Sequence, residues 1–147
     1  MEIFSRSFGE VDPVTAYRLW ALRQDVFVVE QQCPYGDLDG LDLEPGTRHV
    51  FAVAEGRPVA YLRIVDEPNG TCRIGRVCVM AAHRSAGLAG RLMERALADI
   101  GVRDSVLSAQ AHLEGWYTRF GYTVTGPVFL DDGIPHVPMR RSAVPVD

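Results

Sequence analysis

The spacing of apolar residues changes several times along the chain, and each change predicts a different element. Residues 2–8 alternate between apolar and polar side chains and predict a strand, whereas the apolar positions of residues 17–29 recur at helical spacing. Asp12 and Pro13 are start signals for that helix. The carboxylate of an N-cap aspartate accepts hydrogen bonds from the backbone amides of the first turn, and proline has no backbone N–H that would be left unpaired there. The helix is expected to end before Pro34.

Beyond this helix the pattern alternates between strands and helices. Three β-rich runs joined by short turns predict an antiparallel meander, and an amphipathic stretch that ends at Gly101 predicts a second helix. A strand, a short helix and a final hairpin follow, so the order predicts an α/β (α+β) fold with a mixed sheet flanked by helices. In chain order, these elements are expected at residues 49–55, 58–66, 72–80, 88–100, 105–109, 113–120, 122–130 and 136–141.

Composition narrows the class of protein. The 147 residues are 47% hydrophobic and 23% charged, which suffices for one ordinary core and predicts a single domain over residues 1–147. The longest apolar run, residues 77–82, is too short to cross a bilayer, and the N-terminus lacks a secretory signal. A cytoplasmic protein with no membrane partner is therefore expected. Three widely spaced cysteines predict reduced thiols and no metal site.

The net charge of −4 argues against a nucleic-acid partner, which normally requires a surplus of basic residues. The deficit lies in one segment, because Glu30 to Glu44 contains five acids and no base. This acidic segment has two interpretations. It forms either a solvated loop with side-chain turns at Asp37, Asp39 and Asp42, or a funnel of negative charge that attracts a cationic amine.

The most informative segment lies directly before the predicted helix at residues 88–100. Glycines allow a ligand to approach the backbone closely, and the free amides and dipole of a helix's first turn favour a phosphate. The segment therefore predicts an anion cradle, and a glycine-rich turn without a ligand is the alternative. Its residues are Arg84, Ser85, Ala86, Gly87, Leu88, Ala89 and Gly90.

This segment resembles the acetyl-CoA-binding motif R/Q-x-x-G-x-G/A of the GNAT superfamily of N-acetyltransferases, through Arg84, Gly87 and Ala89. A second family signature lies downstream, where Tyr117 stands four residues before a Gly-aromatic pair. Gln110 stands seven residues before that tyrosine, where the family often has Asn. Two motifs at the expected separation make the resemblance specific.

Further segments are similar to the ElaA-like branch of the superfamily, and together they span most of the chain. The sequence departs from that branch at Asp131, where Glu is more usual, and at Ala89, where the family tolerates alanine in place of glycine. The matching segments are residues 22–23 with 26–31, 33–35 with 39–42, 109–113 and 132–136.

The resemblance implies the GNAT acyl-CoA N-acyltransferase fold, with about seven strands, and acetyl-CoA as co-substrate. In this family the strand before the cradle opens at a bulge, its amide polarises the thioester carbonyl, and its backbone pairs with the pantetheine arm. The implied cofactor-binding residues are Val77, Cys78 and Val79 in the strand, Arg84, Ser85, Ala86, Gly87, Leu88, Ala89 and Gly90 in the cradle, and Gln110.

The resemblance also implies transfer of the acetyl group, by direct attack, to an amine of a small molecule or peptide. Tyr117 matches the family's general acid, which gives a proton to the departing thiolate. The alternative for Tyr117 is a place in a core stripe with Leu113, Trp116 and Phe120, which share its helical face.

The general base is less determined, because the strand before the cradle contains no carboxylate. His112 ranks first, since an imidazole titrates near neutral pH and this one lies beside the cofactor motif. A histidine that caps the following helix is the alternative for His112. Glu30, His49 and His136 are the other candidate bases.

Two further functions stay open on the sequence. A non-catalytic GNAT-fold module that binds CoA as a sensor or interaction platform accords with the missing strand carboxylate. A structural or dimerisation protein would not bind CoA. A homodimer is also open, since the final hairpin of a GNAT fold often supports dimers.

Overall fold

The computed structural model describes residues 1–142, which fold around one mixed sheet of eight strands. The strand order is β1-β2-β3-β4-β5-β8-β6, and β7 pairs with the first residues of β8, on the edge opposite β5 that β6 also uses. The sheet has one strand more than expected, because Gly126 and Pro127 interrupt the run predicted at residues 122–130. The strands are β1 (Glu2–Arg6), β2 (Arg48–Ala54), β3 (Arg57–Asp66), β4 (Cys72–Val79), β5 (Ser105–Gln110), β6 (Thr123–Val124), β7 (Phe129–Asp131) and β8 (Ile134–Arg141).

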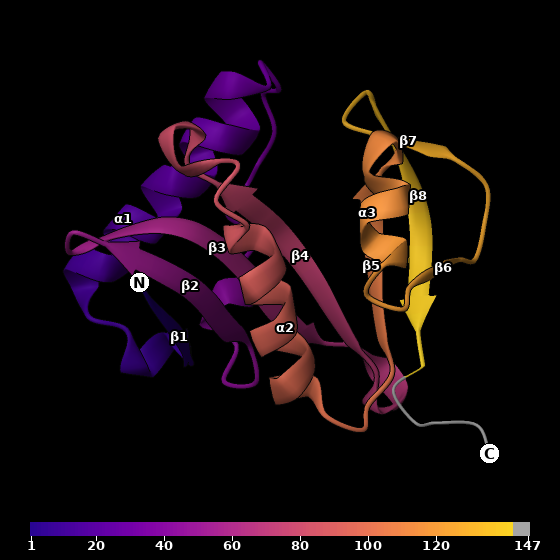
Figure 1. The fold of residues 1–147 in the computed structure, drawn as a ribbon, viewed down its shortest axis with the longest axis horizontal. Coiled ribbons are helices and arrows are strands. Elements are labelled where there is room, and N and C mark those ends of the chain that lie inside the picture. Colours follow the sequence, from indigo (N-terminus) through magenta and orange to yellow (C-terminus); the bar gives the residue numbers. More distant parts are fainter. Residues whose placement is uncertain (143–147) are drawn as a thin grey trace.

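Helices cover both faces of the N-terminal half of the sheet (Figure 1). On one face, α1 (Pro13–Arg23) packs Leu19 and Leu22 against Phe51 and Tyr61. On the opposite face, α2 (Leu88–Ile100) buries its apolar stripe against β2, β3 and β4, and α3 (Glu114–Thr118) joins the same core. No helix in residues 1–142 is long and apolar enough to span a membrane.

The first helix starts as predicted and continues in an unexpected form. The side chain of Asp12 accepts a hydrogen bond from the Thr15 amide at 2.9 Å, with Pro13 in the first turn. After Arg23 the chain continues as a π-helix, Gln24–Glu30. This form is rare in proteins, and where it occurs it is often at a functional site. Tyr17, expected on the apolar face, is 76% exposed.

The two halves of the sheet diverge between β4 and β5. The two parallel strands pair only at their first residues, Cys72 with Ser105 and Arg73 with Val106. Beyond that point the strands separate, as the V-shaped opening in Figure 1 shows. β5, β8 and α3 therefore form a second wall that faces the open side of β4.

Candidate active site

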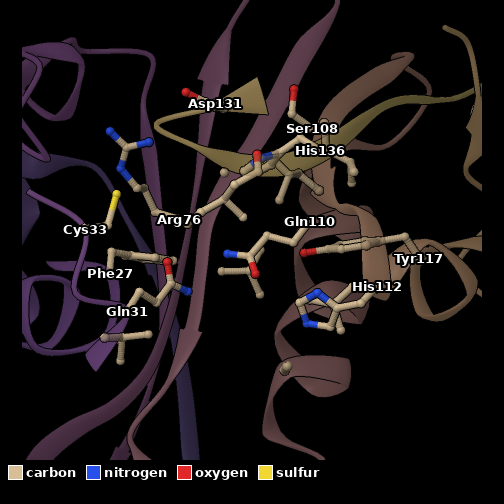
Figure 2. A pocket seen from close by; sticks show the side chains of 18 of the residues that line it. Phe27, Gln31, Cys33, Arg76, Ser108, Gln110, His112, Tyr117, Asp131 and His136 are labelled. Carbon is tan, nitrogen blue, oxygen red and sulfur yellow. The ribbon is translucent and has the colours of Figure 1, made fainter. Parts of the chain in front are cut away.

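A cavity of about 660 Å³ lies where β4 and β5 separate, within the size range of small-molecule sites. The π-helix and the loop after it contribute one side, and α3 with the β7–β8 turn contributes the other (Figure 2). Nine residues predicted for the site line this cavity: Glu30, Val77, Val79, Arg84, Ala89, Gln110, His112, Tyr117 and His136. The other predicted residues, His49, Cys78, Ser85, Ala86, Gly87, Leu88 and Gly90, lie outside its wall.

A β-bulge in β4 adjoins the cavity. The register of β3 and β4 shifts between Tyr61 and Arg63, so that Arg76 and Val77 together oppose one residue of β3. Arg76 has a left-handed φ of 57°, which is unfavourable for a residue with a side chain. A bulge re-aims the strand's groups, and it brings Val77 and Val79 to the cavity wall. The bulge expected from the family resemblance is present.

The side chain of Cys78 points to the opposite face of the sheet. It is buried with Leu19 and Tyr61 in the core under α1. Burial raises the pKa of its thiol to about 12, so the thiol is neutral and unreactive. Only the backbone of Cys78 is available to a ligand in the cavity.

The predicted cradle has the backbone of an anion site. Ser85 and Gly87 both have left-handed φ values, 75° and 73°, and no side chain caps the N-terminus of α2. The amides of Leu88, Ala89 and Gly90 therefore have no acceptor within the helix. Nothing lies within 4 Å of the position that a Cβ on Gly87 would occupy. The cradle thus fits a pyrophosphate such as that of CoA.

An ion pair connects the cradle to the π-helix. The guanidinium of Arg84 lies 2.7 Å from one carboxylate oxygen of Glu30 and 2.9 Å from the other. Its Nε also donates to the carbonyl of Val79 at the end of β4. Both oxygens of Glu30 are engaged, so a role as proton acceptor would require that this pair break.

Tyr117 belongs to the predicted core stripe and also lines the cavity. Its ring packs edge-on against Trp116 and Tyr122, and the residue is only 7% exposed. Its hydroxyl points into the cavity, toward Gln110 in the view of Figure 2, and makes no hydrogen bond within residues 1–142. Burial raises the pKa of the Tyr117 phenol to about 12, so the proton stays on the hydroxyl at neutral pH.

Two histidines line the cavity, on opposite sides of Gln110 in Figure 2. His112 is exposed in the 3₁₀ turn Ala111–Leu113, and the helix cap considered for it is absent, because α3 has no side-chain cap. Nδ1 of His136 lies 2.7 Å from the carbonyl of Ile134 and must donate to it, which leaves Nε2 as the free acceptor.

His49, the remaining histidine candidate, cannot serve the cavity. It is fully buried on the α1 side of the sheet, with Nδ1 2.6 Å from the hydroxyl of Tyr61 and Nε2 3.1 Å from the carbonyl of Asp42. Burial lowers the pKa of its imidazole, so it stays neutral as part of the core.

The acidic segment is neutralised internally, and the prediction of a negatively charged funnel is wrong. Three aspartates pair with three arginines that come from α1, β3 and β4, and two of these aspartates are buried. Only the side-chain turn at Asp39, which accepts from the amide of Leu41, matches the solvated-loop interpretation. The pairs are Arg23 with Asp37 and Asp42, Arg63 with Asp39 and Asp42, and Arg76 with Asp37 and Asp39.

The pair of Arg63 with Asp39 is expected to make the stability of the fold sensitive to acid. Two hydrogen bonds from Arg63 hold the pKa of the Asp39 carboxyl far below its ordinary value. The folded state therefore binds this proton less readily than the unfolded chain, so the stabilisation is present above about pH 4 and is lost as the pH falls below it. We expect Asp39→Asn to flatten the fall of the unfolding free energy between about pH 4 and pH 2.5, measured by urea denaturation. Parallel acid limbs for the two proteins would contradict this assignment.

Several cavity residues were not predicted from the sequence. Phe27 and Gln31 come from the π-helix side, and Arg76 and Ser108 come from the facing strands (Figure 2). Cys33, in the loop after the π-helix, also lines the cavity, and its thiol donates to the carbonyl of Asp132 in the β7–β8 turn at 3.6 Å. The segments similar to the ElaA-like branch contain Phe27, Gln31 and Cys33, and that similarity was the available signal.

Comparison with known proteins agrees with this geometry. Residues 22–143 match the profile of a family described as an acetyltransferase (GNAT) domain. The protein ElaA of Escherichia coli is 40% identical over 142 residues, which cover 92% of this chain and 93% of ElaA.

Solved structures show the same fold. An acyl-CoA N-acyltransferase from Pseudomonas aeruginosa has a TM-score of 0.92 at 41% identity, over 97% of this chain and 100% of that one. The E. coli ElaA structure has a TM-score of 0.90 at 36% identity, over 96% and 99%. An aminoglycoside 6'-N-acetyltransferase complexed with coenzyme A shares the fold alone, with a TM-score of 0.79 at 17% identity over 100% and 99%. The expected acyl-CoA N-acyltransferase fold is confirmed.

Proposed function

The chain belongs to the GNAT acetyltransferases, in the branch that contains ElaA, and we propose that it transfers an acetyl group from acetyl-CoA to an amine. The family establishes acyl transfer as the class of reaction. The donor, the amine acceptor and the residue roles below are our assignment. The observation that carries it is the Tyr117 hydroxyl, buried, protonated and unpaired within residues 1–142, in the cavity between the bulge and α3.

Acetyl-CoA, when bound, supplies an activated thioester. In our assignment the amides of residues 85–90 hold its pyrophosphate, because they are the free donors at the N-terminus of α2. The open edge of β4 at Val77, Cys78 and Val79 pairs with the pantetheine arm, since β5 leaves that edge unpaired. Gln110 reaches the cavity from the facing strand, where its amide can orient the same arm.

Proton movements are assigned to side chains on the wall formed by β5, α3 and β8. Tyr117 donates a proton, or a strong hydrogen bond, to the sulfur as the thioester breaks. The proton that the attacking amine releases goes to His112, the base predicted from the sequence, or to His136, whose free Nε2 makes it the alternative. Glu30 holds Arg84 beside the cradle in this assignment.

The acceptor enters from the end of the cavity opposite the cradle. Asp131 and Asp132 of the β7–β8 turn line that end, and neither carboxylate has an ion-pair partner within residues 1–142. We assign a small-molecule or peptide amine as the acceptor, and these two carboxylates, rather than the acidic segment, would favour a cationic one.

The experiment that tests the proposal measures acetyl-CoA-dependent thiol release with a panel of monoamines, diamines and peptides, and identifies the product by mass. At least one amine should gain one acetyl group for each CoA released. Tight CoA binding with no acetylated product across the panel would favour the alternative, a CoA-binding sensor.

The cradle assignment gives a separate prediction. Gly87→Asp should weaken CoA binding at least about tenfold, measured by calorimetry, because the new carboxylate takes the free amides and repels the pyrophosphate. Aspartate is strained at the left-handed φ of Gly87, so a small fall in Tm is expected, and the control below should share it. Gly70→Asp is the matched control, since Gly70 has φ 75° and equally open space but lies in the β3–β4 turn. Equal CoA affinity in the two variants would refute the cradle.

A further inference from the structure

The neutralised acidic segment has a direct contact with the bulge of β4. Arg76, at the bulge itself, extends its side chain to the loop between the π-helix and β2 rather than to solvent, and that side chain is only 23% exposed. Its Nε lies 2.8 Å from Oδ1 of Asp37, and Nη2 donates to the carbonyl of Asp37 at 3.1 Å. Asp39 lies 3.5 Å from the same nitrogen, and the ring of Tyr35 stacks 5.5 Å from the guanidinium.

The loop is itself anchored, so it can serve as a fixed point for Arg76. Arg23 is fully buried and binds both the carboxylate and the carbonyl of Asp37 at 2.9 Å. The guanidinium of Arg63 donates a hydrogen bond to each carboxylate oxygen of Asp39. The hydroxyl of Tyr35 donates to Asp37 at 2.5 Å. Every anion that Arg76 touches is thus held by a second donor that does not depend on Arg76.

The backbone conformation at the bulge needs such support. A left-handed φ costs a non-glycine residue about 1–2 kcal/mol, so Arg76 adopts 57° only because its surroundings favour it. The next residue, Val77, is on the cavity wall. A relaxed φ at Arg76 would therefore rotate the peptide that Val77 presents to the cavity.

We propose that Arg76 is a positioning residue: its contacts with Asp37 and Asp39 hold the β4 bulge so that the Val77 amide faces the thioester carbonyl. The inference rests on the proposed function for the identity of the group that the amide meets. Because Tyr35 and Cys33 of the same loop line the cavity, the same contact sets the position of the acceptor side relative to the bulge.

The test reads the thioester directly, without an acceptor amine. The isotope-edited infrared frequency of the carbonyl of acetyl-CoA is measured free and bound, together with the acetyl-CoA Kd and, where an acceptor is known, kcat. In the unmutated protein the bound carbonyl should absorb at lower frequency than the free one, because a hydrogen bond from the bulge polarises it.

Four variants separate a positioning role from a structural one. Arg76→Ala and Arg76→Gly should both lose the frequency shift and lower kcat about 100-fold, with the Kd changed less than about threefold. Arg76→Lys, which keeps the charge but not the planar fork, should recover part of the shift and rate. Arg48→Ala should behave as the unmutated protein, because Arg48, in β2, donates to the carbonyl of Ser5 in β1 and does not line the cavity.

Each outcome decides the inference. An unchanged carbonyl frequency in Arg76→Ala would overturn it, and so would unmutated behaviour in Arg76→Gly, since glycine alone would then suffice for the left-handed φ. If Arg76→Ala does not fold, Arg76→Gln replaces it, and retention of the full shift there also overturns the inference. A frequency shift in the unmutated protein without amine acetylation would reject the proposed transfer and leave the role of Arg76 to be read from the variants.

Discussion

Replacement of Tyr117 by phenylalanine is expected to lower kcat about 100-fold or more, while the Kd for acetyl-CoA changes less than about threefold. The substitution removes only the hydroxyl, which points into the cavity and bonds to no group in residues 1–142. The ring stays packed against Trp116 and Tyr122, so the fold should be preserved. Steady-state kinetics with calorimetric titration of acetyl-CoA separates the two effects.

Tyr122→Phe is the matched control for this prediction. Tyr122 is also buried, but its hydroxyl bonds to Oγ of Ser105 at 2.7 Å and does not reach the cavity. This variant should lose some stability and keep kcat. Because burial raises the pKa of Tyr117 to about 12, the unmutated rate should also show no loss of the acid form up to about pH 10. Equal kcat values for Tyr117→Phe and the unmutated protein would remove Tyr117 from the chemistry.

The largest effect on stability is expected at Arg23. Its side chain has no solvent exposure and binds Asp37 and Asp42 at 2.8–2.9 Å, with the guanidinium 4.9 Å from the Trp20 ring. Removal of one partner from a buried ion pair costs about 3–5 kcal/mol, because it leaves a buried charge without compensation. Arg23→Ala should therefore lose about that much unfolding free energy in urea denaturation, a large part of a typical domain's stability.

Two comparisons sharpen this result. Arg103→Ala removes an exposed ion pair with Asp66 and should cost less than about 1 kcal/mol. Arg23→Lys should recover only part of the loss, since an ammonium cannot bind two carboxylates and a carbonyl with fixed geometry. A loss below about 1 kcal/mol in Arg23→Ala would show that the buried network contributes little to folding.

Local signals explain which parts of the fold were predictable. The helix α2, Leu88–Ile100, was predicted with its observed ends, because Gly87 and Gly101 bracket an apolar stripe of regular spacing. The cradle is local in the same sense, since its left-handed residues and free amides lie within one short segment. The π-helix at Gln24–Glu30 has no such signal, and its residues were expected to continue the helix.

The acidic segment shows where sequence reasoning fails. Its partners Arg23, Arg63 and Arg76 lie 14 to 39 residues away and meet it only through the packing of α1, β3 and β4. Arg23 is a charged residue in a helix, and such a residue is ordinarily exposed. Charge counted along the chain therefore suggested an unpaired negative surface, whereas in the folded protein the three aspartates of the segment are paired with three arginines. The places of Phe27 and Ser108 in the cavity wall could not be predicted for the same reason. These two residues meet at one cavity only because β4 and β5 diverge in the folded protein.

The most direct test of the account is a crystal structure of the protein with CoA bound. It should show the pyrophosphate on the amides of residues 85–90, the pantetheine arm along the open edge of β4, and the sulfur within hydrogen-bonding distance of the Tyr117 hydroxyl. CoA bound elsewhere on the molecule, or in this cavity with its sulfur out of reach of Tyr117, would contradict it.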